Sequence, residues 1–122
     1  MRQKLGVAGE QAAARYLRSL GYKILESRYR CPRGEIDLIV RDGTSLVFVE
    51  VKTRRAGTGW CPEEAITVSK QRRIQSVALW YLAGRKKVPE RGVRFDVVAV
   101  WASGNDFECR QYPGAFLGEG MD

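Results

Sequence analysis

The apolar residues of the first twenty positions recur with the spacing of an α-helix. Seven of them fall on one arc at about 100° per residue, namely Leu5, Ala8, Ala12, Ala13, Tyr16, Leu17 and Leu20. The pattern predicts a helix over residues 3–20 that stops at Gly21. Gly9 lies near the centre of the arc, where a missing side chain allows close approach to a sheet, and Glu10 lies at its edge.

Five later segments have the alternating or continuous apolar pattern of strands. They cover residues 23–30, 35–41, 46–53, 94–101 and 107–112, the last as a short edge strand. Asp42-Gly43 is a strong hairpin signal between the second and third segments. The third segment is apolar on both faces, as a central strand is.

A second helix is predicted over residues 69–85, with Ser69 as its N-cap. Its apolar stripe consists of Ile74, Val77, Ala78, Tyr81 and Leu82. The resulting order is helix, three strands, helix and one or two strands. This order predicts an α/β fold with a mixed sheet of four to five strands flanked by helices.

The composition indicates one globular domain over residues 1–122, since 44% of the residues are hydrophobic and 29% are charged. The chain contains no histidine, which excludes Ser-His and Cys-His catalysis and histidine-ligated metal sites. Its cysteines at 31, 61 and 109 lack zinc-ligand spacing and indicate reduced thiols of a cytoplasmic protein. No apolar run approaches the roughly 20 residues of a membrane span.

Charge is distributed unevenly around a net value of +7. Residues 1–34 carry a net +6 and residues 53–94 a net +7, whereas residues 35–52 carry −2 and residues 95–122 carry −4. A small acidic segment therefore separates two basic blocks. Basic surfaces attract phosphate backbones through counterion release, so we expect a nucleic acid partner. The alternative is a basic protein whose charge serves only solubility.

Strand geometry brings three charged residues together. Side chains alternate along a strand, so Glu50 and Lys52 share one face. A two-residue turn at Asp42-Gly43 pairs Asp37 with Phe48, whereas a four-residue loop pairs Asp37 with Glu50, and both registers place Asp37 on the same face. We expect the first helix to pack on this face and to bring Glu10 there.

Two carboxylates on a largely apolar face are costly unless a cation lies between them. Lys52 supplies one positive charge, and a divalent metal would supply two more. Ligation by oxygen alone suits Mg²⁺ or Mn²⁺. A surface Glu-x-Lys and an ordinary hairpin aspartate are the alternative, but the combined pattern favours a metal site.

The second helix adds Lys70 and Gln71, one turn before Ile74 and therefore expected on its inward face. A helix N-terminus attracts phosphate, although a solvated first turn would look the same in sequence. Four arginines flank the same end of the sheet and are expected to contact phosphates, or to serve solubility: Arg54, Arg55, Arg72 and Arg73.

Two segments resemble the PD-(D/E)xK nuclease motif, residues 34–39 (GEIDLI) and 47–52 (VFVEVK). Further segments resemble the YraN family of small bacterial proteins, namely residues 9–10, 16–17, 21–22, 70–73 (KQRR) and 94–98 (RFDVV). That family is similar to archaeal Holliday-junction resolvases. The resemblance implies a restriction endonuclease-like core. It matches Asp37, Glu50 and Lys52 to the catalytic triplet, Glu10 to the helical glutamate and Gln71 to a supporting polar position.

Two positions depart from the pattern. Ile36 replaces the proline of the motif, and Arg28 stands where the family leads us to expect asparagine.

The leading interpretation is a metal-dependent endonuclease that hydrolyses DNA phosphodiester bonds, with a preference for junctions or repair intermediates. Asp37, Glu50 and the backbone carbonyl of Val51 would hold Mg²⁺, and Glu10 would contribute directly or through water. Lys52 would orient the attacking water, with its charged form favoured by the adjacent carboxylates. The alternative is a catalytically silent nucleic-acid-binding module or a repair scaffold. Resemblance to resolvases also suggests a homodimer.

Overall fold

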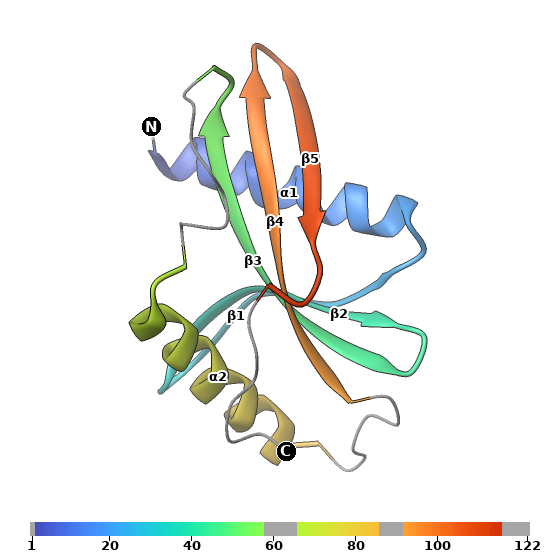
Figure 1. The fold of residues 1–122 in the computed structure, drawn as a ribbon, viewed down its shortest axis with the longest axis vertical. Helices are drawn as coiled ribbons and strands as arrows, with labels where there is room; N and C mark the ends of the chain where they lie inside the picture. The colour runs from blue at the N-terminus through green and yellow to red at the C-terminus, as the bar shows by residue number, and fades with distance from the viewer. Residues whose placement is uncertain (1, 58–65, 86–91, 116–122) are drawn as a thin grey trace.

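The computed structural model describes residues 2–57, 66–85 and 92–115, which form two helices and five strands (Figure 1). In chain order these are α1 (Arg2–Ser19), β1 (Lys23–Cys31), β2 (Gly34–Asp42), β3 (Ser45–Arg55), α2 (Val68–Ala83), β4 (Val93–Ser103) and β5 (Asp106–Tyr112). The predicted α/β class and element order are confirmed. Neither described helix is long and apolar enough to cross a membrane.

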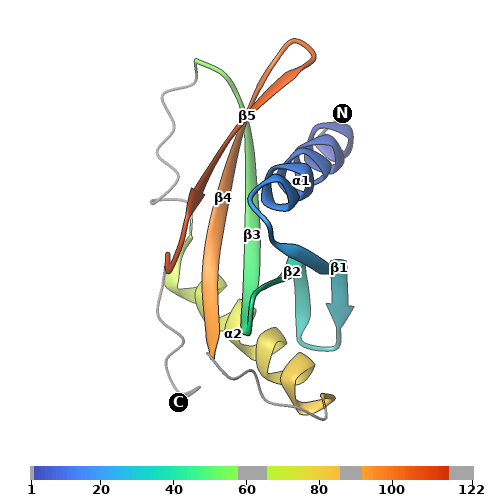
Figure 2. The ribbon, with the colours of Figure 1, turned by 90° about the vertical axis from the view of Figure 1, so that its right-hand side faces the viewer.

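All five strands belong to one mixed sheet, ordered β1-β2-β3-β4-β5. The first three strands are antiparallel, β3 and β4 are parallel, and β5 returns antiparallel to β4. The parallel pair requires a crossover, and α2 provides it. Figure 2 shows β3 and β4 edge-on, with α1 to their right.

The two helices cover opposite faces of the sheet, as their contacts with alternate residues of β3 show. On one face, Ala13 and Leu17 of α1 pack against Val47, Val49 and Val51. A Cβ atom at Gly9 would overlap the side chain of Thr53. The close approach predicted for this glycine is therefore confirmed, and it fixes α1 against the end of β3.

On the other face, α2 packs over Leu46 and Phe48 of β3 and over residues of the adjacent strands. Ile74, Val77 and Tyr81 pack against Phe48 and Phe95. The Tyr81 ring meets Phe48 edge-on, and the two phenylalanine rings stack with centroids 5.6 Å apart. This packing holds the first turn of α2 over the Glu50 side of the sheet.

The second helix begins one residue earlier than predicted, and Ser69 is not its N-cap. Thr67 caps the helix, because its hydroxyl accepts a hydrogen bond from the Lys70 amide at 3.1 Å. Serine and threonine are both good caps, so composition did not separate the two positions. The helix ends at Ala83, two residues before the predicted end, with Gly84 as its C-cap.

The register of the β2–β3 hairpin, continued by one pair, would set Asp37 opposite Glu50. Asp42 pairs with Ser45 and Leu38 pairs with Val49, which is the register of the four-residue-loop alternative. Gly43 has φ 59° in the turn, a left-handed conformation that glycine adopts readily. Beyond the Leu38–Val49 pair the strands diverge: β3 continues beside β4, while the Gly34 end of β2 runs behind α2 (Figure 1).

A buried aspartate fastens the end of β5 to β4. The Asp96 side chain is fully buried and accepts hydrogen bonds from Arg94 at 2.8 Å, Gln111 at 2.8 Å and the Gly114 amide at 2.9 Å. Arg94 and Gln111 also donate to the Tyr22 hydroxyl, each at 3.0 Å. Asp96 and its partners therefore join β4, the end of β5 and Tyr22.

Candidate metal centre and adjoining cleft

Two carboxylates meet where β2 and β3 diverge. The Val51 amide, which follows Glu50 in β3, donates a hydrogen bond of 2.8 Å to Asp37 Oδ2. The Asp37 side chain thus accepts the hydrogen bond of this amide at the fork, the point beyond the Leu38–Val49 pair where β2 and β3 separate. Burial and the neighbouring Glu50 carboxylate raise the pKa of Asp37 to about 7. An acidic pair with such a raised pKa is suited to receive a cation.

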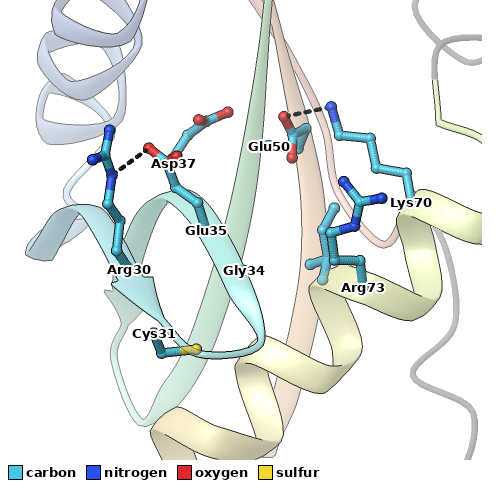
Figure 3. Close-up of a pocket in the computed structure, with 9 residues that line it drawn as sticks. Arg30, Cys31, Gly34, Glu35, Asp37, Glu50, Lys70 and Arg73 are labelled. Atoms are coloured by element: carbon cyan, nitrogen blue, oxygen red, sulfur yellow. Dashed lines mark ion pairs between the residues drawn. The ribbon is translucent and has the colours of Figure 1, made fainter.

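Two lysines already lie against this pair. Lys70 Nζ is 3.1 Å from Glu50 Oε1, and Lys52 Nζ is 3.9 Å from the same oxygen. Figure 3 shows Lys70 extending from α2 toward Glu50. Glu50 and Lys52 therefore share a face as predicted, and α2 adds a second ammonium group.

The protonation of Lys52 differs from the expectation that carboxylates would favour its charged form. Burial and the adjacent Lys70 lower the pKa of Lys52 to about 8, outweighing the attraction of Glu50 and Asp37. Periodicity along α2 and β3 does not show that Lys70 lies beside Lys52. Lys52 consequently remains mainly charged near neutral pH, with a proton that it releases more readily than an exposed lysine.

The first helix does not pack on the Glu50 face, so that prediction is wrong. Alternation along β3 showed which residues share a face, but not which helix covers it. Glu10 nevertheless lies close enough to Asp37 for that charge, together with burial, to raise the pKa of Glu10. It approaches from the α1 side of the sheet, at the fork between β2 and β3.

Arg28 holds Glu10 at this fork. Its Nε lies 3.0 Å from Glu10 Oε2, and its backbone has φ 53°. This left-handed conformation is uncommon for residues other than glycine and is favoured by asparagine. The geometry therefore explains why asparagine suits this position, whereas arginine adds a cation that pairs with Glu10.

The ligand chemistry fits a magnesium-type site with few protein ligands. No cluster of three or more metal-ligating side chains occurs among residues 2–57, 66–85 and 92–115. Mg²⁺ needs only one or two carboxylates, since it keeps several waters and takes oxygens from substrate phosphates. Asp37 and Glu50 provide that number. Ligation by Glu10 or by the carbonyl oxygen of Val51 stays a prediction.

The Asp37 and Glu50 carboxylates line a cleft of about 590 Å³ that lies between the β1–β2 hairpin and α2 (Figure 3). Its basic side chains are Arg30, Lys70 and Arg73. A Cβ atom at Gly34, where φ is 141°, would press against the Arg73 side chain. Glycine at this position therefore lets the hairpin approach α2 closely while Arg73 passes into the cleft.

The structure separates the predicted nucleic-acid-binding residues into groups. Lys70 and Arg73 line the cleft, whereas the exposed Arg54 and Arg55 at the end of β3 and the exposed Arg72 on α2 do not. Gln71 does not share the orientation of Lys70. Its side-chain amide donates to the Ile66 carbonyl at 3.1 Å, and it lines a separate pocket that includes Val97 and Tyr112.

Sequence reasoning missed Arg30 as a cleft residue. It pairs in register with Glu35 across the turn between β1 and β2, and its Nε lies 3.5 Å from the Glu35 carboxylate. The turn signal at residues 32–34 could have indicated this pairing. It could not have shown that the hairpin tip faces α2.

Comparisons with known proteins place the chain in a bacterial family. A sequence model described as "Uncharacterised protein family UPF0102" matches residues 9–100. The "UPF0102 protein" of Syntrophotalea carbinolica is 47% identical over 115 residues, covering 94% of this chain and 93% of the relative. That of Syntrophus aciditrophicus is 50% identical over 97 residues, covering 80% and 76%. Both the family match and these relatives show that the chain belongs to the UPF0102 family, also called the YraN family.

Proposed function

We propose that this protein is a metal-dependent nuclease that hydrolyses phosphodiester bonds of DNA. The observation that carries the proposal is the convergence of Asp37, Glu50 and Lys52. The two carboxylates line a cleft that also contains basic side chains. Paired carboxylates provide ligands for a divalent cation, and the lysine provides a cation at the reacting phosphate. The PD-(D/E)xK resemblance of the two strand segments, with its restriction endonuclease-like fold, supports the same assignment.

Each residue has a distinct role in this proposal. A bound Mg²⁺ or Mn²⁺ would lower the pKa of its water and neutralise charge on the phosphate. Asp37 and Glu50 hold the cation, and the Val51 amide fixes the Asp37 carboxylate through its 2.8 Å hydrogen bond. Lys52 orients the attacking water and stabilises negative charge that develops on the phosphoryl oxygens.

The cleft and the uneven charge distribution favour DNA as the substrate. Arg30, Lys70 and Arg73 form its basic side, and the exposed Arg54, Arg55 and Arg72 extend the positive charge outside it. A junction or another branched repair intermediate is the substrate form that the resolvase resemblance suggests. A homodimer would allow two sites to cut opposed strands.

A catalytically silent DNA-binding module is the competing function. Its support is that Lys70 neutralises Glu50 and Arg28 neutralises Glu10 without any metal. Such pairing would make the acidic cluster a structural feature. Both functions predict DNA binding, so hydrolysis distinguishes them.

Purified protein with labelled duplex, flap, single-stranded and four-way-junction DNA provides the test. We expect cleavage with Mg²⁺ or Mn²⁺, none with EDTA, and loss of cleavage in Asp37→Asn and Glu50→Gln. A wild-type protein that binds these DNAs but cleaves none of them with either metal would establish the silent module instead.

A further inference from the structure

The charges of the candidate centre balance without a metal. Asp37 and Glu50 supply two carboxylates, and Lys52 and Lys70 supply two ammonium groups that interact with Glu50. Buried carboxylates require such compensation. The chain therefore carries its own cations at the position where the proposed function needs a divalent one.

The two lysines are held differently. Lys52 projects from β3, and its side chain is only 17% exposed. Lys70 extends from the first turn of α2, is 33% exposed and makes the shorter contact, 3.1 Å to Glu50 Oε1. A long, partly exposed side chain at a helix end can change rotamer at little cost. Lys70 is thus the ammonium that can leave Glu50.

Lys70 also borders the cleft assigned to DNA. It lies one turn before Ile74 and on the same wall as Arg73, with both cations directed into the cleft (Figure 3). A divalent cation that takes the Glu50 oxygen competes directly with the Lys70 ammonium. A phosphate in the cleft would then provide a new anionic partner within the reach of Lys70.

We propose that Lys70 is the resident counter-ion of Glu50, that a divalent metal displaces it, and that the released ammonium binds a DNA phosphate beside Arg73. This inference rests on the proposed nuclease function for its metal and its substrate. It gives Lys70 opposite effects on the two ligands: it opposes metal binding in free protein and supports DNA binding in the metal-loaded protein. One side chain therefore couples the two binding events.

Calorimetric titration of the full chain with Mn²⁺, without DNA, tests the competition. Lys70→Met should bind Mn²⁺ about tenfold more tightly, because one opposing charge near the metal is removed. Arg73→Met is the matched control, since Arg73 lines the same cleft but forms no ion pair with Glu50 within the described parts of the chain. It should change the affinity by less than about threefold, and Lys70→Arg should stay near wild type.

Equal or weaker Mn²⁺ binding by Lys70→Met, or an equal gain in Arg73→Met, would overturn the inference. Thermal denaturation checks the folded state of each variant. Without metal, Lys70→Met should melt below wild type, because Glu50 loses its closer counter-ion, and Mn²⁺ should raise its Tm by more than it raises that of wild type. An identical Mn²⁺ response would count against displacement.

Asp37→Asn and Glu50→Gln separate failure of this inference from failure of the proposed function. If either variant binds Mn²⁺ as tightly as wild type, or if wild type binds none, the metal centre itself is wrong. If both variants weaken binding while Lys70→Met leaves it unchanged, only the displacement of Lys70 is wrong.

Discussion

Asp37 shows at the scale of one residue how the fold prepares a cation site. In a flexible chain this carboxyl would ionise near its ordinary pKa of 3.8, whereas burial and Glu50 raise the value to about 7 in the folded protein. The Val51 amide partly opposes that shift by donating to the carboxylate. The group is therefore held in place, while burial and the nearby Glu50 carboxylate disfavour its charged form.

The raised pKa of Asp37 gives the stability of the metal-free protein a definite pH dependence. The folded state binds the Asp37 proton more tightly than the unfolded state, so this stabilisation is complete below about pH 4 and is lost as the pH rises through about 7. Differential scanning calorimetry should show Tm falling between about pH 4 and pH 7 more steeply in wild type than in Asp37→Asn. Parallel curves for the two proteins would contradict the shift.

Arg28 is the second residue at this scale whose role depends on the folded backbone. Its left-handed backbone and its ion pair with Glu10 are properties of the folded chain. The resemblance identified the position as unusual, but gave no reason. The φ value supplies the reason, since asparagine tolerates this conformation better than most residues do.

At the scale of elements, the contact between α1 and β3 sets how Glu10 approaches the fork. Gly9 precedes Glu10 and lies directly against Thr53. Any side chain at position 9 must therefore push the helix away from the strand. Helical periodicity could place Gly9 on the inward arc, whereas only the packed structure identifies Thr53 as its neighbour.

Gly9→Ala should destabilise the protein by about 1–3 kcal/mol, because the added methyl group overpacks the α1–β3 contact. Gly6→Ala is the control within the same helix, since a Cβ atom there has nothing within 4 Å. It should be neutral or stabilising by up to about 1 kcal/mol through helix propensity. Urea denaturation measures both, and equal effects would show that the Thr53 contact does not limit the approach of α1.

The pairing of strands was more predictable than the packing of helices on the sheet. Alternation and the Asp42-Gly43 signal correctly put Asp37 with Glu50 and Lys52, because both allowed registers preserve the same parity. The face covered by α1 was predicted wrongly, since parity contains no information about which helix packs where. Lys70 and Gln71 were treated alike because both precede Ile74 by one turn, yet only Lys70 reaches Glu50.

At the scale of the whole molecule, the fork between β2 and β3 is where the acidic segment meets residues of the two basic blocks. The acidic segment at residues 35–52 contains Asp37 and Glu50, while Arg30 and Lys70 come from the two basic blocks on either side of it. The β1–β2 hairpin and α2 bring all three segments to one cleft. Charge blocks separated in sequence thus become neighbours in the fold.

Lys52 provides the most direct test of the account, because its ammonium is assigned to the transition state. Lys52→Ala should fold, keep most of its DNA affinity and lose about 10²–10³ in single-turnover cleavage rate with Mg²⁺. Lys23→Ala, at the opposite end of β1 from Arg30, is the control and should cleave at the wild-type rate. If wild type cleaves in a metal-dependent manner and Lys52→Ala cleaves equally fast, hydrolysis occurs elsewhere and the assigned centre is wrong.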